Sequence, residues 1–552
     1  MKFTNLWLSI KHKTTSLSNL TICFAIFLAS LSFMLLTPNN NLSGGDLAMF
    51  LNGQMRVVQG DTPYKDFWTP YGVLESYFPA FIFKNFGQTI NSIYLANIII
   101  CALIVLVTFI LAMQVTKSRI LSLCCAALFL FNGIYWRTFY YIHAYMLFLL
   151  LSTLFLFFYF EKNRKRDLLL VGIFTAVAFL FKIEMTGAYG VALFLIIITR
   201  NLLIGKRLNN SVRELFLILV GFMVPFLILI LIHPEVVPYL YKYMVVDSLN
   251  SGTSMNLPYF HSIGSYFKIL LSKISLFENQ NSIFNLFQVG FFFLHLLNVT
   301  LNYILPFLIL PISVIVFRRI KIRDSNKIYL LFFIFWFLVT FPKSLGRSAA
   351  SQLSHALMPL FFVQVLIISS FSRNLFLEIK PTLKRIVYLV TIISLVLSTT
   401  IVISSSLNTI SKPNYQIETD YGIIKTDEKE SARETNEVIS LIYNYTQSTE
   451  DYIFVSTQEA PPFYTLTNRK NPTYYSAMFD VIIRPSLEKQ NKMCQDLVDK
   501  GTKIVIHDAY WGYDQLPERQ FLHAAKTLHE CIINNFEFIG NYGRYQIYIL
   551  PN

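Results

Sequence analysis

The sequence predicts an all-α polytopic membrane domain followed by a small exoplasmic α/β domain. Hydrophobic residues make up 54% of the 552 residues and charged residues only 14%, whereas a soluble domain carries roughly 25% charged residues. The apolar residues gather in runs long enough to cross a hydrocarbon core, which needs about 20 residues per helix. The tail after residue 404 instead has a soluble composition, with 14 Lys or Arg against 19 Asp or Glu.

Eleven apolar runs predict about eleven transmembrane helices. They cover residues 17–36, 91–113, 118–136, 140–160, 168–182, 185–199, 214–232, 287–317, 328–342, 356–371 and 386–404. Only the turn "KIEMTG" separates the fifth run from the sixth, and the eighth run is over-long, so the number of spans stays open by one or two. Residues 1–404 are expected to form the membrane domain, with a first outer loop at 37–90, and residues 405–552 the C-terminal domain.

The charges of the loops predict an orientation. The segments on the same side as the N-terminus hold 22 Lys or Arg against 5 Asp or Glu, and such an excess marks cytoplasmic loops. The N-terminus is therefore expected in the cytoplasm and the C-terminal domain on the periplasmic or extracellular side. The first run is too long for a cleaved signal and is expected to stay as a span. Because orientation explains the net charge of +14, we predict no nucleic-acid partner.

The C-terminal domain shows alternating helix and strand patterns. Helices are predicted at 430–446, near 486–498 and at 517–534, with strands at "DYIFVST" and "KIVIH" and a closing hairpin at "FEFIGNYGRYQIYIL". Cys494 and Cys531 lie in this domain, where oxidation is possible. The sequence leaves open whether they form a disulfide or stay as two free thiols.

Charged and polar residues gather at the outer ends of the predicted spans. They are Asp46, Asp61, Asp66, Glu75, Arg137, His143, Lys182, Glu184, His233, Glu235, Asp247, His261, Lys343, Arg347 and His355. A carboxylate can take a proton from an acceptor hydroxyl, and Lys or Arg can hold a phosphate. With apolar walls nearby, this face suits a membrane enzyme whose substrate is a phosphate on a lipid tail.

The first outer loop has a pattern of its own. Apolar residues recur at helical spacing in "DLAMFLNGQMRVV", which predicts an interfacial amphipathic helix beginning at Asp46. A turn, "QGDTPY", follows, and a second interfacial helix is expected to start near Pro70. Asp46 could be a simple helix cap or a base, since a helix N-terminus favours the ionised carboxylate that a base must be. Asp61 and Glu75 are expected to be turn and surface groups.

Four segments resemble the GT-C class of membrane glycosyltransferases, in the branch of protein mannosyltransferases and lipid A aminoarabinose transferases, which is glycosyltransferase family 39-like. The first is "GGDLAMFLNGQMRVVQGDTPYKDFWTPYGVLESYFPAFIF" in the first loop, and the second is "FLFKIEMTGAY" at 179–189. "GRSAASQLSHALMPLFF" at 346–362 and "PPFYTLTNRKNPTYY" in the outer domain complete the set. They occur in the same order as in that family and span most of the chain.

The resemblance implies a hexosyl- or pentosyltransferase that moves a sugar from a polyprenyl-phosphate donor, with inversion, in a bacterial inner membrane. Asp46 matches the family's proposed base. The aminoarabinose transferases carry a phosphate-binding Lys where this chain has Thr69, so Lys65, Lys182 or Arg347 would have to supply that cation. The acceptor is left open between a glycan, a lipid and a protein, and so is the participation of a divalent cation.

The remaining candidate residues each have a structural alternative. Asp66 is expected to bind acceptor or a metal, or to satisfy backbone amides in a turn. Arg347 and His355 are expected to contact phosphate, or to be an ordinary surface arginine and interfacial histidine. Lys182 and Glu184 are expected to bind substrate, or to pair with each other at the interface.

Two other functions compete with a glycosyltransferase. One is a flippase or transporter for a lipid or glycan, which is disfavoured because the spans hold few charged residues and no internal repeat. The other is a non-catalytic scaffold with a binding domain. His523 and His529 are six residues apart and do not share one helical face, so we expect these two and His507 to be solvated or packed histidines and assign no metal ligands.

Overall fold

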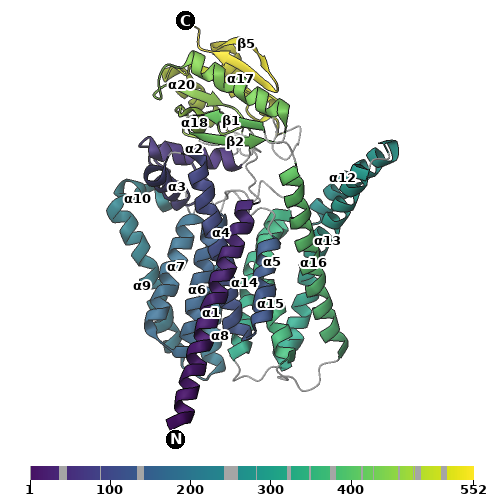
Figure 1. Ribbon diagram of the computed structural model, residues 1–552. Helices are drawn as coiled ribbons and strands as arrows, with labels where there is room; N and C mark the ends of the chain where they lie inside the picture. Colours follow the sequence, from purple (N-terminus) through teal and green to yellow (C-terminus); the bar gives the residue numbers. More distant parts are fainter. Residues whose placement is uncertain are drawn as a thin grey trace.

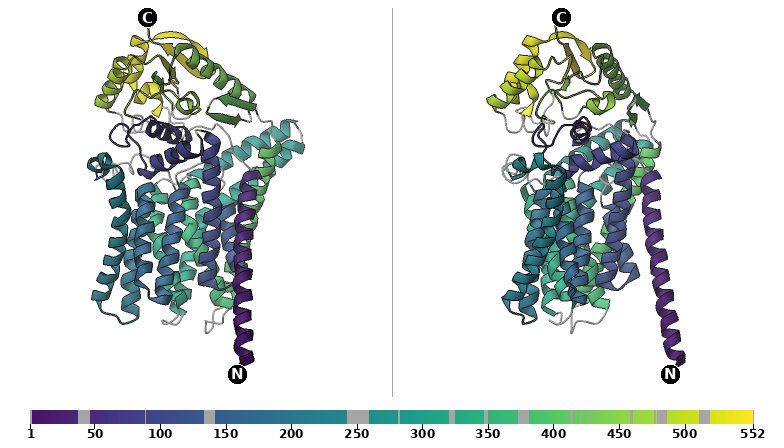
Figure 2. Two further views of the ribbon diagram at one scale, coloured as in Figure 1. Left: turned by 60° about the vertical axis from the view of Figure 1, so that its left-hand side comes forward. Right: turned by 90° about the vertical axis from the view of Figure 1, so that its left-hand side faces the viewer.

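The larger part of the protein is a bundle of long helices, and a smaller α/β unit covers one end of it (Figure 1). The computed structural model describes residues 2–36, 46–87, 89–132, 142–241, 259–280, 283–319, 325–346, 350–372, 381–411, 415–419, 421–426, 428–457, 460–475, 478, 486–510 and 519–551. The N-terminus lies at the opposite end of the bundle from the α/β unit (Figures 1 and 2).

Each of the eleven predicted apolar runs coincides with one helix. The helices are α1 (Lys2–Leu36), α4 (Ile90–Thr116), α5 (Arg119–Phe131), α6 (Ile142–Lys162), α7 (Lys165–Phe181), α8 (Ile183–Leu203), α9 (Leu208–Ile232), α13 (Ile283–Arg319), α14 (Ser325–Gly346), α15 (Ala350–Ser372) and α16 (Pro381–Ser411). Within the described residues, eight of them are long and apolar enough to cross a membrane, and α5, α7 and the apolar part of α15 are shorter. The helical membrane fold is confirmed.

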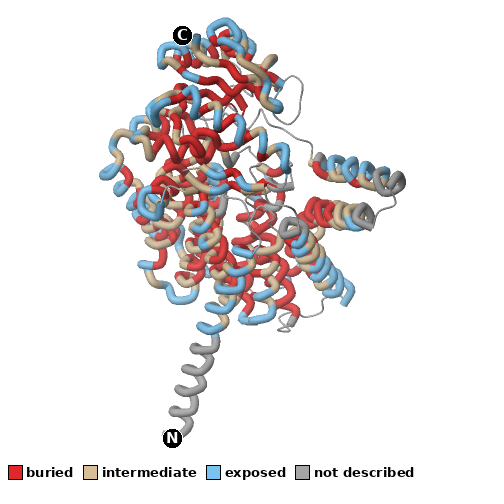
Figure 3. Tube along the Cα trace, turned by 45° about the horizontal axis from the view of Figure 1, so that its top comes forward, coloured by how far each residue is buried: buried red, intermediate tan, exposed pale blue. Residues whose placement is uncertain are grey.

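The outside of the bundle is apolar where a soluble protein would be polar. Helix α9, for example, exposes Leu219, Leu227 and Leu231 although it is one of the most hydrophobic helices. An apolar helix face with no protein partner suits contact with lipid chains. In Figure 3 the buried residues are concentrated inside the bundle and in the α/β unit.

Helices α7 and α9 approach each other closely through two glycines. A Cβ atom on Gly172 would lie 2.0 Å from the carbonyl oxygen of Ile218, and one on Gly221 would lie 2.1 Å from that of Leu169. No side chain fits at either position, so the two backbones can touch, as is common where membrane helices pack. This contact holds the first half of α7 against α9.

The segments between spans differ in two places from the sequence prediction. The second interfacial helix, α3 (Leu74–Phe86), begins four residues later than Pro70, because residues 70–73 are held in a turn against α7. The long segment between α9 and α13, treated as a loop, contains η2 (Pro234–Val236), α10 (Val237–Leu240) and the 20-residue α12 (His261–Gln280).

The C-terminal part is an α/β unit, as predicted. After α16 come a hairpin of β1 (Tyr415–Thr419) and β2 (Gly422–Thr426), and a four-stranded sheet of order β3-β4-β6-β5. The sheet strands are β3 (Ile453–Val455), β4 (Ile504–His507), β5 (Glu537–Tyr542) and β6 (Tyr545–Ile549). Strands β3 and β4 are parallel, and the other pairs are antiparallel. The domain boundary that we placed after residue 404 stays a prediction.

Helices cover both faces of this sheet. They are α17 (Lys429–Tyr445), α18 (Phe463–Thr467), α20 (Leu487–Asp499), α21 (Phe521–Ala524) and α22 (Lys526–Asn535). Side chains alternate along each strand, so Ile453 and Val455 join the core that includes α17 residues, whereas Phe454 joins the core formed with α20 and α22. A disulfide between Cys494 and Cys531 links α20 to α22 and resolves the open question of their pairing.

The first outer loop lies between the two parts of the molecule. Helix α2 (Asp46–Val58) forms as predicted, and with α3 it lies across the end of the bundle, directly beneath the α/β unit (Figure 2). Its inward-facing residues Leu51 and Met55 are fully buried. The loop therefore has protein on both sides.

Candidate active site at the end of the helix bundle

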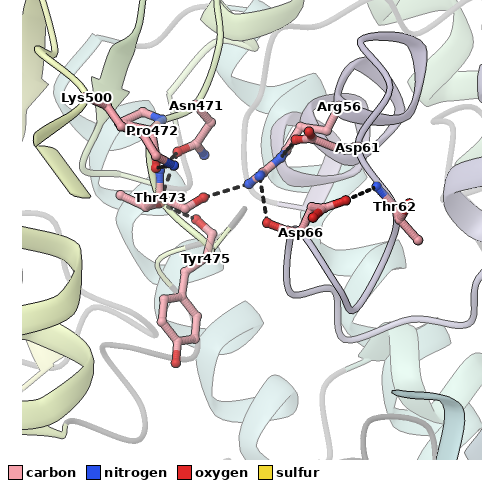
Figure 4. A network of polar contacts seen from close by, with 9 residues as sticks. All are labelled: Arg56, Asp61, Thr62, Asp66, Asn471, Pro472, Thr473, Tyr475 and Lys500. Carbon is pink, nitrogen blue, oxygen red and sulfur yellow. Dashed lines mark hydrogen bonds and ion pairs between the residues drawn. The ribbon is translucent and has the colours of Figure 1, made fainter. Parts of the chain in front are cut away.

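Arg56 is the centre of a polar network in the first outer loop (Figure 4). Its guanidinium donates to the Asp61 carboxylate at 2.6 Å, to the carbonyl oxygen of Asp66 at 2.8 Å and to that of Thr473 at 2.6 Å. The side chain is buried, and its Cζ atom lies over the Phe67 ring, 4.9 Å from the ring centre. A guanidinium presents five donors in a rigid planar fork, so it can hold three acceptors in fixed directions.

The turn after α2 is held in a defined shape. The Asp66 carboxylate accepts the Thr62 amide at 2.8 Å. Tyr64 adopts a positive φ of 67°, its hydroxyl donates to the Tyr71 carbonyl, and its own carbonyl accepts from the Tyr474 hydroxyl at 2.8 Å. A tyrosine in the left-handed region is uncommon and persists only where the surroundings fix it. These bonds supply that constraint.

The outer-domain segment that ends in "NPTYY" packs onto this turn. The Trp68 amide donates to the Tyr474 carbonyl at 2.8 Å, and the Trp68 and Tyr475 rings lie 6.4 Å apart. Together with the bond from Arg56 to Thr473, these contacts join two of the four segments that carry the family resemblance. The α/β unit therefore shapes the first loop directly.

A break between α7 and α8 brings charged groups beneath the loop. Lys182 has extended backbone angles (φ −150°, ψ 108°) that end one helix and start the next. Its side chain is buried, with the ammonium 5.9 Å from the centre of the Tyr145 ring and 3.9 Å from the Glu184 carboxylate. The same Glu184 oxygen accepts a charged hydrogen bond from Lys343 on α14. Two lysines thus share one carboxylate.

Gly72 seats the first loop on this break. Its amide donates to the Phe181 carbonyl at 3.0 Å, and a Cβ atom at this position would lie 2.0 Å from the carbonyl oxygen of Leu180. Only glycine allows two backbones to approach so closely. This contact places the start of α3 beside Lys182.

Glu75 does not lie on the surface as we predicted. It lies in the first turn of α3, its side chain is only 2% exposed, and none of the described residues bonds its Oε1 atom. Burial raises the pKa of the Glu75 carboxyl well above its ordinary value, and the nearby Lys182 ammonium opposes part of that shift. The prediction failed because the turn before α3 packs into the α7–α8 break instead of facing water. The prediction for Asp61, a partly exposed turn residue, is confirmed.

His233 and Glu235 line another edge of the same region. The His233 ring stacks on Tyr77 of α3 with 4.1 Å between ring centres, and its Nδ1 lies 3.0 Å from Glu235. The Glu235 backbone amide and His233 lower the pKa of the Glu235 carboxyl, and Lys65 contributes more weakly. Lys65 itself is exposed at the turn.

The other predicted site residues stand as follows. Asp46 is the first residue of α2, and its side chain lies outside the described part of the structure. Arg347 also lies outside the described residues. His355 is buried in the first half of α15. Among the residues that the structure describes, no three His, Cys, Asp or Glu side chains come together as a possible metal site.

Sequence reasoning missed Arg56, and it placed Lys343 and Glu75 at the outer ends of the spans without giving either a role in the site. Arg56 carries the loop network, Lys343 pairs with Glu184, and Glu75 is buried beside Lys182. The available signals were weak: Arg56 is the one charge inside the apolar pattern after Asp46, and Lys343 ends an apolar run. Nothing local distinguishes Glu75 from a surface glutamate.

Comparison with known proteins shows which family and which folds this chain resembles. Residues 71–236 match the model of the dolichyl-phosphate-mannose-protein mannosyltransferase family. The crystal structure of ArnT from Cupriavidus metallidurans in the apo state aligns over 97% of this chain and 98% of its own, with a TM-score of 0.52 and 11% identity. Both the matched family and ArnT are of the GT-C type. The chain resembles the GT-C membrane glycosyltransferases.

A second GT-C structure supports the same fold. The oligosaccharyltransferase of Archaeoglobus fulgidus in the apo form aligns over 97% of this chain and 74% of its own, with a TM-score of 0.52 and 11% identity. No curated protein matches the sequence. The family match runs from Tyr71 to Val236 and so includes Glu75, Lys182 and Glu184, whereas Asp46 and Lys343 lie outside it. The GT-C resemblance of the sequence is confirmed.

Proposed function

We propose that this GT-C-type chain transfers a hexose or pentose from a polyprenyl-phosphate donor to an acceptor hydroxyl, with inversion at the anomeric carbon. One observation carries the proposal: Lys182 and Lys343 both contact the Glu184 carboxylate, at the helix break directly beneath the first outer loop. Fixed cations at the edge of an apolar bundle suit a phosphate whose lipid tail lies among the helices.

The residues divide the chemistry between them. Lys182 and Lys343 hold the donor phosphodiester, which carries one negative charge. Asp46 takes the proton from the acceptor hydroxyl while that oxygen attacks the anomeric carbon from the face opposite the phosphate. The bond from the anomeric carbon to the phosphate oxygen breaks, and polyprenyl phosphate leaves with one further negative charge, which the lysines stabilise. A single displacement of this kind inverts the anomeric centre.

The remaining candidate residues are proposed to contact the substrates. Asp66 and Lys65, on the turn after α2, would contact acceptor or donor, and Arg347 and His355 would contact phosphate. The acceptor is a glycan, a lipid or a protein. The charge asymmetry of the loops supports an N-terminus in the cytoplasm and a site on the outer face, and the family resemblance favours a bacterial inner membrane, with that face in the periplasm.

Replacement of Asp46 by asparagine tests the reaction. Membranes containing Asp46→Asn are expected to transfer label from a panel of undecaprenyl-phosphate-linked hexoses and pentoses at least about 100-fold more slowly than wild type, with unchanged binding of undecaprenyl phosphate. Asp499→Asn, at an exposed carboxylate of α20, serves as the control. Full transfer by Asp46→Asn would remove the proposed base. Movement of the intact donor across proteoliposomes without transfer would indicate a flippase instead.

A further inference from the structure

Glu75 is a buried carboxyl group, and the described residues leave one of its oxygen atoms without a hydrogen bond. Its side chain is 2% exposed and Oε1 has no hydrogen-bond partner among the described residues. A buried polar atom without a partner destabilises a fold by about 1–3 kcal/mol, and nearly all buried polar atoms in native proteins are bonded. An unbonded oxygen at this place indicates a position where a ligand completes the bonding.

An apolar cluster and one cation lie near Glu75. Val73, two residues before it, belongs to a buried cluster with Leu180 and Leu229 from α7 and α9. Lys182 is the one charged group that acts appreciably on the carboxyl within the described structure. The bond from Gly72 to Phe181 fixes this arrangement, because it anchors the backbone three residues before Glu75.

The charges in this region favour a neutral Glu75. Lys182 and Lys343 are two cations, and Glu184 pairs with both. If Glu75 were also ionised, the cluster would be neutral and a phosphate would meet two carboxylates. With Glu75 neutral, the cluster carries one net positive charge, which matches the single negative charge of a phosphodiester. The strong desolvation that raises the pKa of Glu75 agrees with the neutral form.

We propose that Glu75 binds the donor phosphate as a neutral carboxylic acid and donates a hydrogen bond to a phosphate oxygen beside Lys182. The proposal rests on the proposed function, since it adds a residue to the same phosphate position. An ionised carboxylate there would only repel the phosphate, whereas a neutral acid supplies a donor. Because the phosphate gains negative charge as the sugar leaves, this hydrogen bond strengthens in the transition state.

Binding of undecaprenyl phosphate to the full-length protein in nanodiscs separates the possibilities. Glu75→Gln keeps a neutral N–H donor and is expected to bind within about threefold of wild type. Glu75→Leu fills the same space without a donor and is expected to bind about 10- to 100-fold more weakly, the loss of a hydrogen bond to a charged group. Ser76→Ala, at the neighbouring buried residue of α3, is the matched control.

Thermal stability distinguishes binding from a structural role. Glu75→Leu is expected to melt at or above the wild-type temperature, because it removes a buried atom that lacks a partner; Glu75→Met replaces it if the leucine variant does not fold. Wild-type affinity in Glu75→Leu, or a loss in Glu75→Gln equal to that in Glu75→Leu, would overturn the proposal. So would tenfold tighter binding by Glu75→Gln, the sign of an ionised glutamate.

The same measurements identify a failure of the proposed function. Wild-type protein is expected to bind undecaprenyl phosphate more tightly than undecaprenol, and Lys182→Met is expected to abolish that preference. If wild type shows no preference for the phosphate, the proposed function fails and the role of Glu75 fails with it. If Lys182→Met loses the preference while Glu75→Leu keeps it, the phosphate site stands and only the inference about Glu75 is wrong.

Discussion

The Arg56 side chain donates a hydrogen bond to the backbone carbonyl of Thr473, 417 positions later in the chain. It also holds Asp61 and the Asp66 carbonyl, so one buried guanidinium ties the turn of the first outer loop to the α/β unit. The loop that begins with Asp46 and ends beside Lys182 is therefore shaped by both parts of the protein.

Replacement of Arg56 by methionine is expected to loosen this loop. The carbonyls of Asp66 and Thr473 would lose their donor, at about 1–3 kcal/mol for each buried acceptor, and transfer is expected to fall about 100-fold because reacting groups tolerate little displacement. Faster hydrogen exchange at Trp68, whose amide bonds to Tyr474, would report the loosening. Arg433→Met, at an exposed arginine of α17, is the control; equal exchange in both variants would contradict the role of Arg56.

A methyl group on Gly72 is expected to separate the loop from the helix break. The added Cβ would meet the Leu180 carbonyl at 2.0 Å, and such overpacking destabilises by about 1–3 kcal/mol. The thermal inactivation temperature of Gly72→Ala in detergent should fall, together with undecaprenyl phosphate binding. Gly187→Ala in α8 places its methyl in open space and should be neutral or slightly stabilising. Equal behaviour of the two variants would show that the close approach is unimportant.

The disulfide between Cys494 and Cys531 is expected to stabilise the α/β unit. It closes a loop of 37 positions between α20 and α22, and native disulfides of this kind contribute about 2–4 kcal/mol. The double variant Cys494→Ser with Cys531→Ser should show faster hydrogen exchange in α20 and α22 but not in the helix bundle. Peptide mapping without reductant should recover the linked peptides from wild type. Recovery of two free thiols instead would contradict the pairing.

Acid is expected to destabilise the α/β unit through a buried histidine. Burial lowers the pKa of His507 to about 3, and the nearby His529 contributes. Below the ordinary histidine pKa of about 6.5, the unfolded chain binds a proton that the folded chain does not, so stability falls as pH falls from about 6.5 towards 3. Between pH 6.5 and 5 the loss is about 2 kcal/mol.

Hydrogen exchange of the β4 amides in the full-length protein measures this effect. Exchange corrected for its intrinsic pH dependence should reveal lower protection at pH 5 than at pH 6.5 in wild type. His507→Gln removes the titrating group that bonds Ser456 and His529, and should reduce that difference. His523→Gln, at an exposed histidine of α21, is the comparison, and a pH response unchanged by His507→Gln would count against the explanation.

The fold could be predicted from the sequence because its signals are local. Each span is a continuous apolar run, and the strands of the α/β unit alternate or lie between turn residues. The start of α3 was placed too early because the restraint on Gly72 comes from Phe181, more than a hundred residues away. Helix α12 was missed because its amphipathic pattern lacks the length of apolar run that marks a span.

The site was only partly predictable, because its contacts join distant positions. Lys182 and Glu184 are near neighbours and could be chosen from one segment, but Lys343 bonds Glu184 across 159 positions. Glu75 reads as a surface residue in its own segment and is buried only because of what packs against it. The roles assigned to Asp46, Asp66, Lys65, Arg347 and His355 stay predictions.

The long-range bond between Arg56 and Thr473 also sets an order in which the protein can mature. The first outer loop leaves the ribosome early, yet its partner at Thr473 is made 417 residues later. At a synthesis rate of about 5–20 residues per second, that interval is roughly 20 to 80 s. During this time Arg56 has no acceptor from the α/β unit, so a chain inserted in the membrane cannot complete the loop until translation is almost finished.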